Sequence, residues 1–127
     1  MNQNASKLDT DQLEVMLSGV SQAQVNPIVE ELFRDFSERR EALAGAIETG
    51  DYTACRLQAH SLKALSQTFG FEALYQLARK LEEACRISDD TEIREIAAGV
   101  FDLMSTSRQA LSVYLEEKKS LTKSDNA

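Results

Sequence analysis

The sequence predicts an all-α protein, an antiparallel up-down four-helix bundle with an additional short N-terminal helix. Three observations lead to this fold class. Apolar residues recur at the three- and four-residue spacing of amphipathic helices along most of the chain. No segment alternates polar and apolar residues between turn signals, as a strand would. The segments between the predicted helices are short, so consecutive helices are expected to run antiparallel.

The first two predicted helices differ in how clearly they begin. A short helix is expected from Thr10 to Val20, where apolar residues share one face. The second helix is expected to start after Asn26 as N-cap, with Pro27 at the first helical position. It should end at the sequence "TGD", because Gly50 can adopt a left-handed cap.

Three further helices complete the predicted bundle. The third runs from the N-cap Asp51 to Gly70, and the fourth follows a minimal turn, with apolar residues at helical spacing over 71–85. The last helix is expected over 90–118, after a capping box in which Asp89 is followed three residues later by Glu92.

Length and composition indicate one ordinary domain. With 127 residues, the chain can bury a core of its own, so we expect a single domain over 1–127 with flexible polar tails at 1–8 and 119–127. The net charge of -7 argues against binding to nucleic acid or to anionic membranes. No apolar run reaches membrane-spanning length, and the start lacks the apolar core of a signal peptide. We therefore expect a cytoplasmic protein.

The two cysteines, Cys55 and Cys85, have no paired metal-ligand spacing. We interpret them as free thiols in a reducing compartment. One histidine and two distant cysteines make a poor ligand set, so no metal site is predicted.

The only histidine, His60, lies in the stretch "QAHSLKALSQTFG" of the third predicted helix. At about 100° per residue, it points away from the apolar stripe of that helix. Its own face carries two cations and a small residue that leaves room for a bulky group: Arg56, Lys63, Ala64 and Gln67. Such a histidine can be mere solvated surface. Nearby cations, however, favour a neutral, nucleophilic imidazole and stabilise an anion transferred to it.

The fourth predicted helix carries a possible partner for this imidazole. Glu82 and Arg86 lie four residues apart, on one side of that helix. A carboxylate that accepts the Nδ1 proton of His60 would leave Nε2 free as the nucleophile. The alternative is an ordinary surface ion pair between Glu82 and Arg86.

Together these residues resemble a known family. The stretch "QAHSLKALSQTFGFEALYQLARKLEEACR" is similar to the histidine phosphotransfer (HPt) domain of phosphorelays, over about 30 residues. The matching positions include an alanine-histidine pair, a lysine three residues later, a glycine at the tenth position and spaced leucines ending in leucine-glutamate: Ala59, His60, Leu62, Lys63, Ser66, Gly70, Leu74, Leu77, Leu81 and Glu82.

The resemblance implies a role for each matching residue. His60 would be the phosphoacceptor through Nε2, Lys63 would lie near the phosphoryl group, and Glu82 would hydrogen-bond the other ring nitrogen. Ala64 stands where glycine is usual, and Arg86 stands where some members carry a basic residue. Expected contacts with partners are Arg56, Leu57, Ala64, Gln67 and Arg86. Leu65, Gln67 and Phe71 depart from the residues common in the family, which bears on the choice of partner.

The implied function is that of a phosphocarrier rather than an enzyme, because the chain has no P-loop and no room for an ATP-binding kinase domain. A monomer would relay a phosphoryl group between His60 and aspartates in the receiver domains of a hybrid sensor kinase and of a response regulator. No cofactor is expected, and Mg²⁺ would belong to the receiver. The alternative is an adaptor or inhibitor bundle that binds a kinase or regulator independently of phosphorylation.

Overall fold

The structure, a computed structural model, describes residues 8–125, with side chains for residues 8–121, and this part of the chain forms five helices and no strand. Their bounds are α1 Thr10–Leu17, α2 Gln22–Thr49, α3 Tyr52–Phe69, α4 Glu72–Arg86 and α5 Asp90–Asp125. The predicted all-α fold is confirmed.

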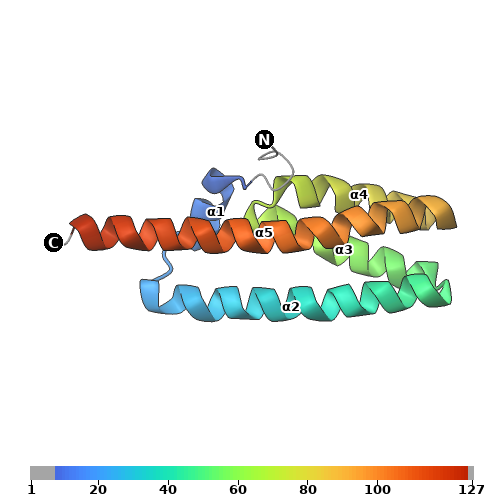
Figure 1. Cartoon of the computed structure of the whole chain (residues 1–127), viewed down its shortest axis with the longest axis horizontal. Helices are drawn as coiled ribbons and strands as arrows, with labels where there is room; N and C mark the ends of the chain where they lie inside the picture. The colour runs from blue at the N-terminus through green and yellow to red at the C-terminus, as the bar shows by residue number, and fades with distance from the viewer. Residues whose placement is uncertain (1–7, 126–127) are drawn as a thin grey trace.

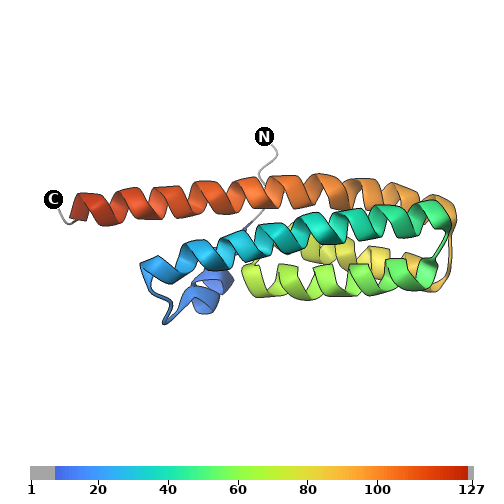
Figure 2. The same cartoon turned by 90° about the horizontal axis from the view of Figure 1, so that it is seen from below.

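Four of these helices form a closed bundle. Helix α3 packs against α2 and α4, and α5 packs against α4 and α2, so each long helix has two neighbours. The four axes run alongside one another, alternating in direction, and α5 continues past the ends of the other helices (Figures 1 and 2). The short α1 packs against α3. This is the predicted up-down four-helix bundle with an additional N-terminal helix.

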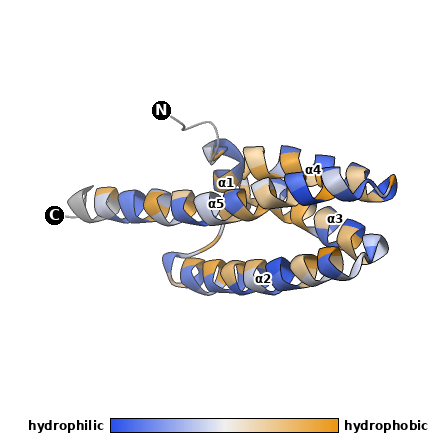
Figure 3. Cartoon of the chain, turned by 45° about the vertical axis from the view of Figure 1, so that its right-hand side comes forward, coloured by the Kyte–Doolittle hydropathy of each residue, from blue (hydrophilic) through white to orange (hydrophobic). Residues whose placement is uncertain are grey.

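The core lies between the apolar faces of the helices. Orange, hydrophobic and blue, hydrophilic stretches alternate along the helices (Figure 3). Among the large side chains that are fully buried are members of all five helices: Leu13, Leu43, Leu62, Leu74, Leu81, Ile93 and Leu111. In α3, Ser66 is buried beside the partly buried Leu65, and its hydroxyl donates to the Leu62 carbonyl at 2.7 Å. The hydroxyl is satisfied within its own helix, which makes its burial tolerable.

The boundaries of α3 follow from local capping. The Asp51 side chain accepts a hydrogen bond from the Ala54 amide at 3.1 Å and thereby caps the first turn. Gly50 before the helix and Gly70 after it both have a left-handed φ, 71° and 78°. Glycine adopts this conformation without the steric cost of a Cβ atom. These caps agree with the predicted bounds and set the register that places His60 on the surface.

The turn between α3 and α4 is also where α1 is attached. The Asp9 amide donates to the Gly70 carbonyl at 2.6 Å, and Leu8 forms an isolated bridge with Phe71. At the other end of α1, Lys118 of α5 contacts the Glu14 carboxylate at 2.6 Å. Helix α1 therefore bridges the α3–α4 turn and the C-terminal part of α5.

Three predicted helix ends are wrong, and two of them lie near the N-terminus. Helix α1 stops at Leu17 rather than at Val20, because Gly19 takes a left-handed φ of 80° and turns the chain. Helix α2 begins at Gln22, before the predicted cap at Asn26. The start is set by Ser21, whose amide donates to the Gln24 side chain at 2.9 Å in the manner of a capping box.

Pro27 therefore lies inside α2, six residues into the helix, rather than at its first position. At that depth the proline cannot donate the usual hydrogen bond to the carbonyl four residues earlier. The helix tolerates this loss because its extra first turns bury Val25 against the core. Apolar burial of a valine, worth roughly 1.5–3 kcal/mol, offsets the missing bond.

Helix α5 also runs further than predicted, to Asp125 rather than to Lys118. The segment "KSLTKSD" contains neither glycine nor proline, so nothing in it breaks the helix. The predicted tail 119–127 thus begins inside α5, and its residues 126–127 lie outside the described part of the chain, as do residues 1–7 of the predicted N-terminal tail. Within residues 8–125, no helix has both the length and the apolar character that crossing a bilayer requires.

Candidate functional site

His60 stands on the outer face of α3, with 61% of its side chain exposed. Its helical neighbours Ala59 and Leu62 are fully buried. This difference in burial arises because α3 has one apolar side that faces the core, and His60 lies on the opposite side. The imidazole is therefore fixed to a rigid helix but open to a partner.

Glu82 of α4 is the one described carboxylate that contacts this imidazole. Its Oε2 lies 2.8 Å from His60 Nδ1, while its Oε1 lies 2.8 Å from Lys63 Nζ. The Glu82 side chain is only 22% exposed, whereas the imidazole projects further into solvent. The half-buried Glu82 carboxylate thus contacts both His60 and Lys63 of α3.

The charge state of Glu82 follows from these contacts. The hydrogen bond from Lys63 lowers the pKa of Glu82 most, the one from His60 lowers it further, and burial acts in the opposite direction. The net effect is a lowered pKa, so Glu82 is ionised at neutral pH. An anionic acceptor at Nδ1 favours the tautomer whose proton is on Nδ1. The Nε2 lone pair then faces solvent, where it can act as a nucleophile.

Lys63 contacts Glu82 in this structure, and its place near a phosphoryl group stays a prediction from the resemblance. Its ammonium is directed at Glu82, and its side chain is 26% exposed. In this structure Lys63 holds the carboxylate that holds the imidazole.

Arg86 is paired with Glu83, not with Glu82. Its Nε lies 3.2 Å from Glu83 Oε1, and a second guanidinium nitrogen contacts the other oxygen of that carboxylate. The alternative of a Glu82–Arg86 ion pair is therefore wrong. Glu82 instead uses both of its oxygens for His60 and Lys63.

The other predicted contact residues surround His60 on the same face of α3. Arg56, Leu57, Ala64 and Gln67 are all exposed. Leu57 stands out because 56% of this large apolar side chain faces solvent, one turn before His60. An exposed leucine beside a small alanine offers a partner a smooth, partly apolar surface.

A basic cleft runs along the boundary of α3 and α4 next to this face. We call it the basic cleft, and its volume is about 400 Å³. Its lining residues are Arg56, Lys63, Arg79, Lys80, Glu82, Glu83 and Arg86. Arg79 and Lys80 are not among the site residues predicted from the sequence. Arg79 lies three and four residues before Glu82 and Glu83, so these residues share a face of α4. That this face adjoins α3 depends on how the two helices pack.

The two cysteines lie beneath this boundary. Cys55 and Cys85 are buried, and their sulfur atoms are 2.7 Å apart across α3 and α4. Burial raises the pKa of each thiol, and for Cys85 the contact with Cys55 raises it further. The thiols belong to the core rather than to the exposed site. Within the described residues, no group of histidine, cysteine, aspartate and glutamate side chains could hold a metal ion.

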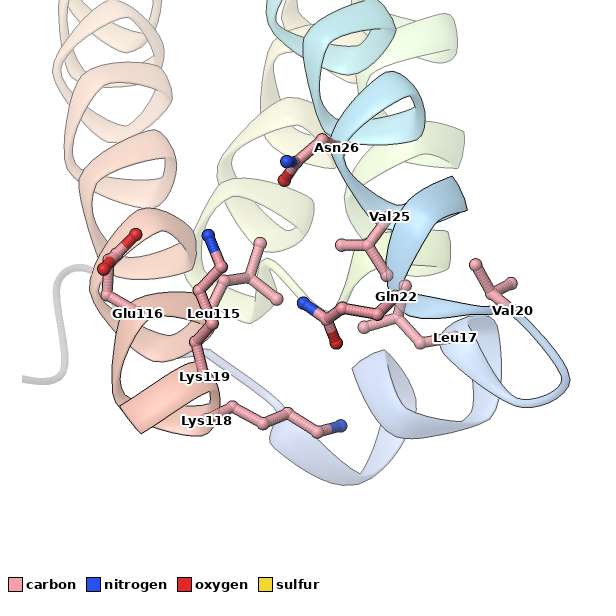
Figure 4. Close-up of a pocket in the computed structure, with 9 residues that line it drawn as sticks. All are labelled: Leu17, Val20, Gln22, Val25, Asn26, Leu115, Glu116, Lys118 and Lys119. Atoms are coloured by element: carbon pink, nitrogen blue, oxygen red, sulfur yellow. The ribbon is translucent and has the colours of Figure 1, made fainter. Parts of the chain in front are cut away.

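A second pocket lies at the opposite end of the molecule. It has a volume of about 190 Å³ and is lined by residues of α1, the α1–α2 turn, α2 and α5, among them Leu17, Gln22, Leu115 and Lys119 (Figure 4). It shares no lining residue with the basic cleft. The pocket contains no histidine or cysteine, so it offers no nucleophile of the kind found at His60.

Comparison with known families shows the family to which the chain belongs. The model of the Hpt domain family matches residues 27–117, which include α3, α4 and most of α2 and α5. No match was found among curated proteins or among solved structures. The family match covers more than half of the chain, and therefore this chain belongs to the Hpt domain family.

Proposed function

We propose that His60 of this Hpt domain protein carries a phosphoryl group between the aspartates of two receiver domains, one in a hybrid sensor kinase and one in a response regulator. Family membership already gives the chain a phosphotransfer role in two-component signalling. The observation that supports His60 as the carrier is its 2.8 Å contact with Glu82 through Nδ1, which leaves Nε2 open on an exposed helix face.

The proposed reaction is a direct exchange between an acyl phosphate and an imidazole. The Nε2 lone pair attacks the phosphorus atom of the receiver's aspartyl phosphate, a nitrogen–phosphorus bond forms, and the bond from phosphorus to the aspartate oxygen breaks. The aspartate leaves as a carboxylate. The ring becomes cationic with its proton still on Nδ1, where the Glu82 carboxylate stabilises it. The reverse sequence passes the group to the second receiver.

Each partner contributes a different part of the chemistry. Mg²⁺ and an acidic pocket on the receiver would neutralise the charge of the moving phosphoryl group. This chain contributes an oriented nucleophile and a docking surface formed by Arg56, Leu57, Ala64, Gln67 and Arg86. It would act as a monomeric phosphocarrier in the cytoplasm, where receiver domains operate.

Labelling with radioactive phosphate tests the proposal. Receiver domains carrying labelled aspartyl phosphate are mixed with the chain, and acid-labile, base-stable phosphate on the chain is measured. His60→Gln should abolish the label. The melting temperature should stay nearly unchanged, because the imidazole is exposed and Glu82 keeps its contact with Lys63.

The outcome is unambiguous because the chain has one histidine. Label that persists on His60→Gln would refute His60 as the carrier. A wild-type chain that binds receivers tightly yet never becomes labelled would instead favour an adaptor that works independently of phosphorylation.

A further inference from the structure

The charge balance of the basic cleft is opposite to that of the chain as a whole. The whole chain is acidic, with 21 acidic and 14 basic residues. The basic cleft reverses this balance, since five cations and only two carboxylates line it. Such a concentration of like charge on one side of an acidic protein produces a local positive potential that attracts anions.

Most of these cations have no carboxylate partner. Lys63 is paired with Glu82, and Arg86 is paired with Glu83. Among the described residues, Arg56, Arg79 and Lys80 form no ion pair, and Arg79 donates only to the neutral side chain of Gln76 at 3.1 Å. These three cations are therefore available to attract an external anionic surface, to an extent that falls as salt is added.

The basic cleft also adjoins the proposed phosphoacceptor. Arg56 lies one turn before His60 and Lys63 lies about one turn after it, and both line the cleft. The other flank of α3 differs in character. There, a groove between α2 and α3 is mainly apolar, and its charged lining residues are the carboxylates Glu31 and Asp35. A partner centred on His60 would therefore meet unpaired cations on the α4 side, whereas Arg39 of α2, which contacts Gln58 of α3, is paired with Asp35.

We propose that the basic cleft binds an acidic segment on the docking face of the partner receiver domain, and that Arg56, Arg79 and Lys80 thereby select which receivers exchange phosphate with His60. This inference rests on the proposed function. Charges at the edge of an interface mainly steer the encounter and discriminate between partners, rather than drive the chemical step. Receivers with a neutral or basic surface at this position would react slowly.

Single charge reversals provide the test. Arg79→Glu and Lys80→Glu each change the charge by two units on the α4 side of the cleft, away from the imidazole. Lys119→Glu is the matched control, because it makes the same change on an exposed residue of α5 that lines the other pocket. Transfer from one labelled receiver that phosphorylates the wild type is measured as a function of receiver concentration and of salt.

The expected result is a specific loss of encounter rate. At low ionic strength, kcat/KM should fall roughly tenfold for each reversal in the cleft, with kcat nearly unchanged, and the difference from wild type should shrink as salt is added. Lys119→Glu should transfer at nearly the wild-type rate. A receiver in which one acidic residue of the docking face is changed to lysine should recover part of the lost rate with Lys80→Glu.

Three results would overturn the inference. Reversals in the cleft that leave kcat/KM unchanged would show that the partner does not reach it. A loss of the same size in Lys119→Glu would indicate a general effect of net charge. A loss in kcat alone, insensitive to salt, would place the effect in the chemical step. If no receiver labels even the wild type, the proposed function itself fails and this inference fails with it.

Discussion

Glu82 reaches His60 from the neighbouring helix and lies 2.8 Å from its Nδ1. The contact crosses the boundary between α3 and α4, which are joined by a tight turn at Gly70 and Phe71. Because a rigid turn and two packed helices hold both residues, the imidazole is oriented before any partner arrives. Pre-oriented groups lose less freedom on reaching the transition state, which is a direct contribution to rate.

Replacing Glu82 should therefore change the tautomer of His60 as well as the rate. Glu82→Ala removes the anionic acceptor, so the fraction of neutral imidazole with its proton on Nδ1 should fall, as measured by ¹⁵N NMR of the ring. Phosphotransfer should slow by about tenfold, because an exposed charge-assisted hydrogen bond is worth about 1.5 kcal/mol. Glu82→Gln keeps a neutral acceptor, so its tautomer fraction and its transfer rate should lie between those of the wild type and of Glu82→Ala. A slower variant with an unchanged tautomer would contradict an orienting role.

Replacing Lys63 should make the site more sensitive to acid. Lys63 is the largest cause of the lowered pKa of Glu82, so Lys63→Ala should raise that pKa toward the usual range of a glutamate. A carboxylate with a lowered pKa contributes stability at neutral pH, and this contribution is lost as pH falls through its folded-state pKa. In Lys63→Ala the loss should begin at higher pH. NMR titration of the Glu82 carboxyl carbon measures the shift, and identical titrations in both proteins would refute it.

Ala64 should tolerate only small side chains. Ala64→Glu places bulk and negative charge one turn from His60 on the exposed face of α3, so transfer should fall steeply through steric hindrance and repulsion of the phosphoryl group. Ala64→Gly should remain active and lose about 1 kcal/mol of stability. Ala98→Glu is the matched control, because Ala98 is an exposed alanine on α5. Wild-type rates in Ala64→Glu would mean that the partner docks elsewhere.

Gly70 and Gly50 offer a controlled comparison of backbone strain and close contact. Both have a left-handed φ, so an alanine at either position costs roughly 1–2 kcal/mol. A Cβ atom at Gly50 meets nothing within 4 Å, whereas one at Gly70 collides with the Asp9 carbonyl. Urea unfolding should show a clearly larger loss for Gly70→Ala, since the contact of α1 with the α3–α4 turn is lost as well. Equal losses would mean that α1 is only loosely attached there.

The two thiols should be protected in the native state. Cys55 and Cys85 are buried, and their raised pKa values leave little thiolate at pH 8. A chromogenic disulfide reagent should therefore react slowly with the folded protein and rapidly with both thiols in concentrated urea. Rapid reaction of the native protein would show that α3 and α4 separate easily beneath the candidate site.

The sequence was a reliable guide to structure wherever the controlling interaction was local. The bounds of α3 depend on Asp51, Gly50 and Gly70, whose preferences act within a few residues and need no knowledge of the fold. The start of α2 was misjudged because two local signals compete, the capping pair at Ser21 and the proline at Pro27. Their outcome depends on the burial of the extra turns, which is a tertiary effect.

In the candidate site, too, the sequence predicts the local features but not those that depend on tertiary packing. Helical periodicity was enough to place His60 on the exposed side of α3. The pairing of Lys63 with Glu82, and of Arg86 with Glu83, depends on how α3 and α4 are rotated against each other. Spacing along one helix does not contain that rotation. For the same reason, Arg79 and Lys80 emerged as neighbours of the phosphotransfer face only from the packed bundle.

The attachment of α1 has a consequence for the order in which the chain can fold during synthesis. Glu14 contacts Tyr114 and Lys118, about a hundred residues further along the chain. Contacts between such distant residues close a long loop and form late. On the ribosome, α1 emerges before the other four helices, but its docking is complete only after the second half of α5 has been made. A nascent chain halted before residue 114 should thus leave α1 accessible to proteases, even after the turn at Gly70 has been made.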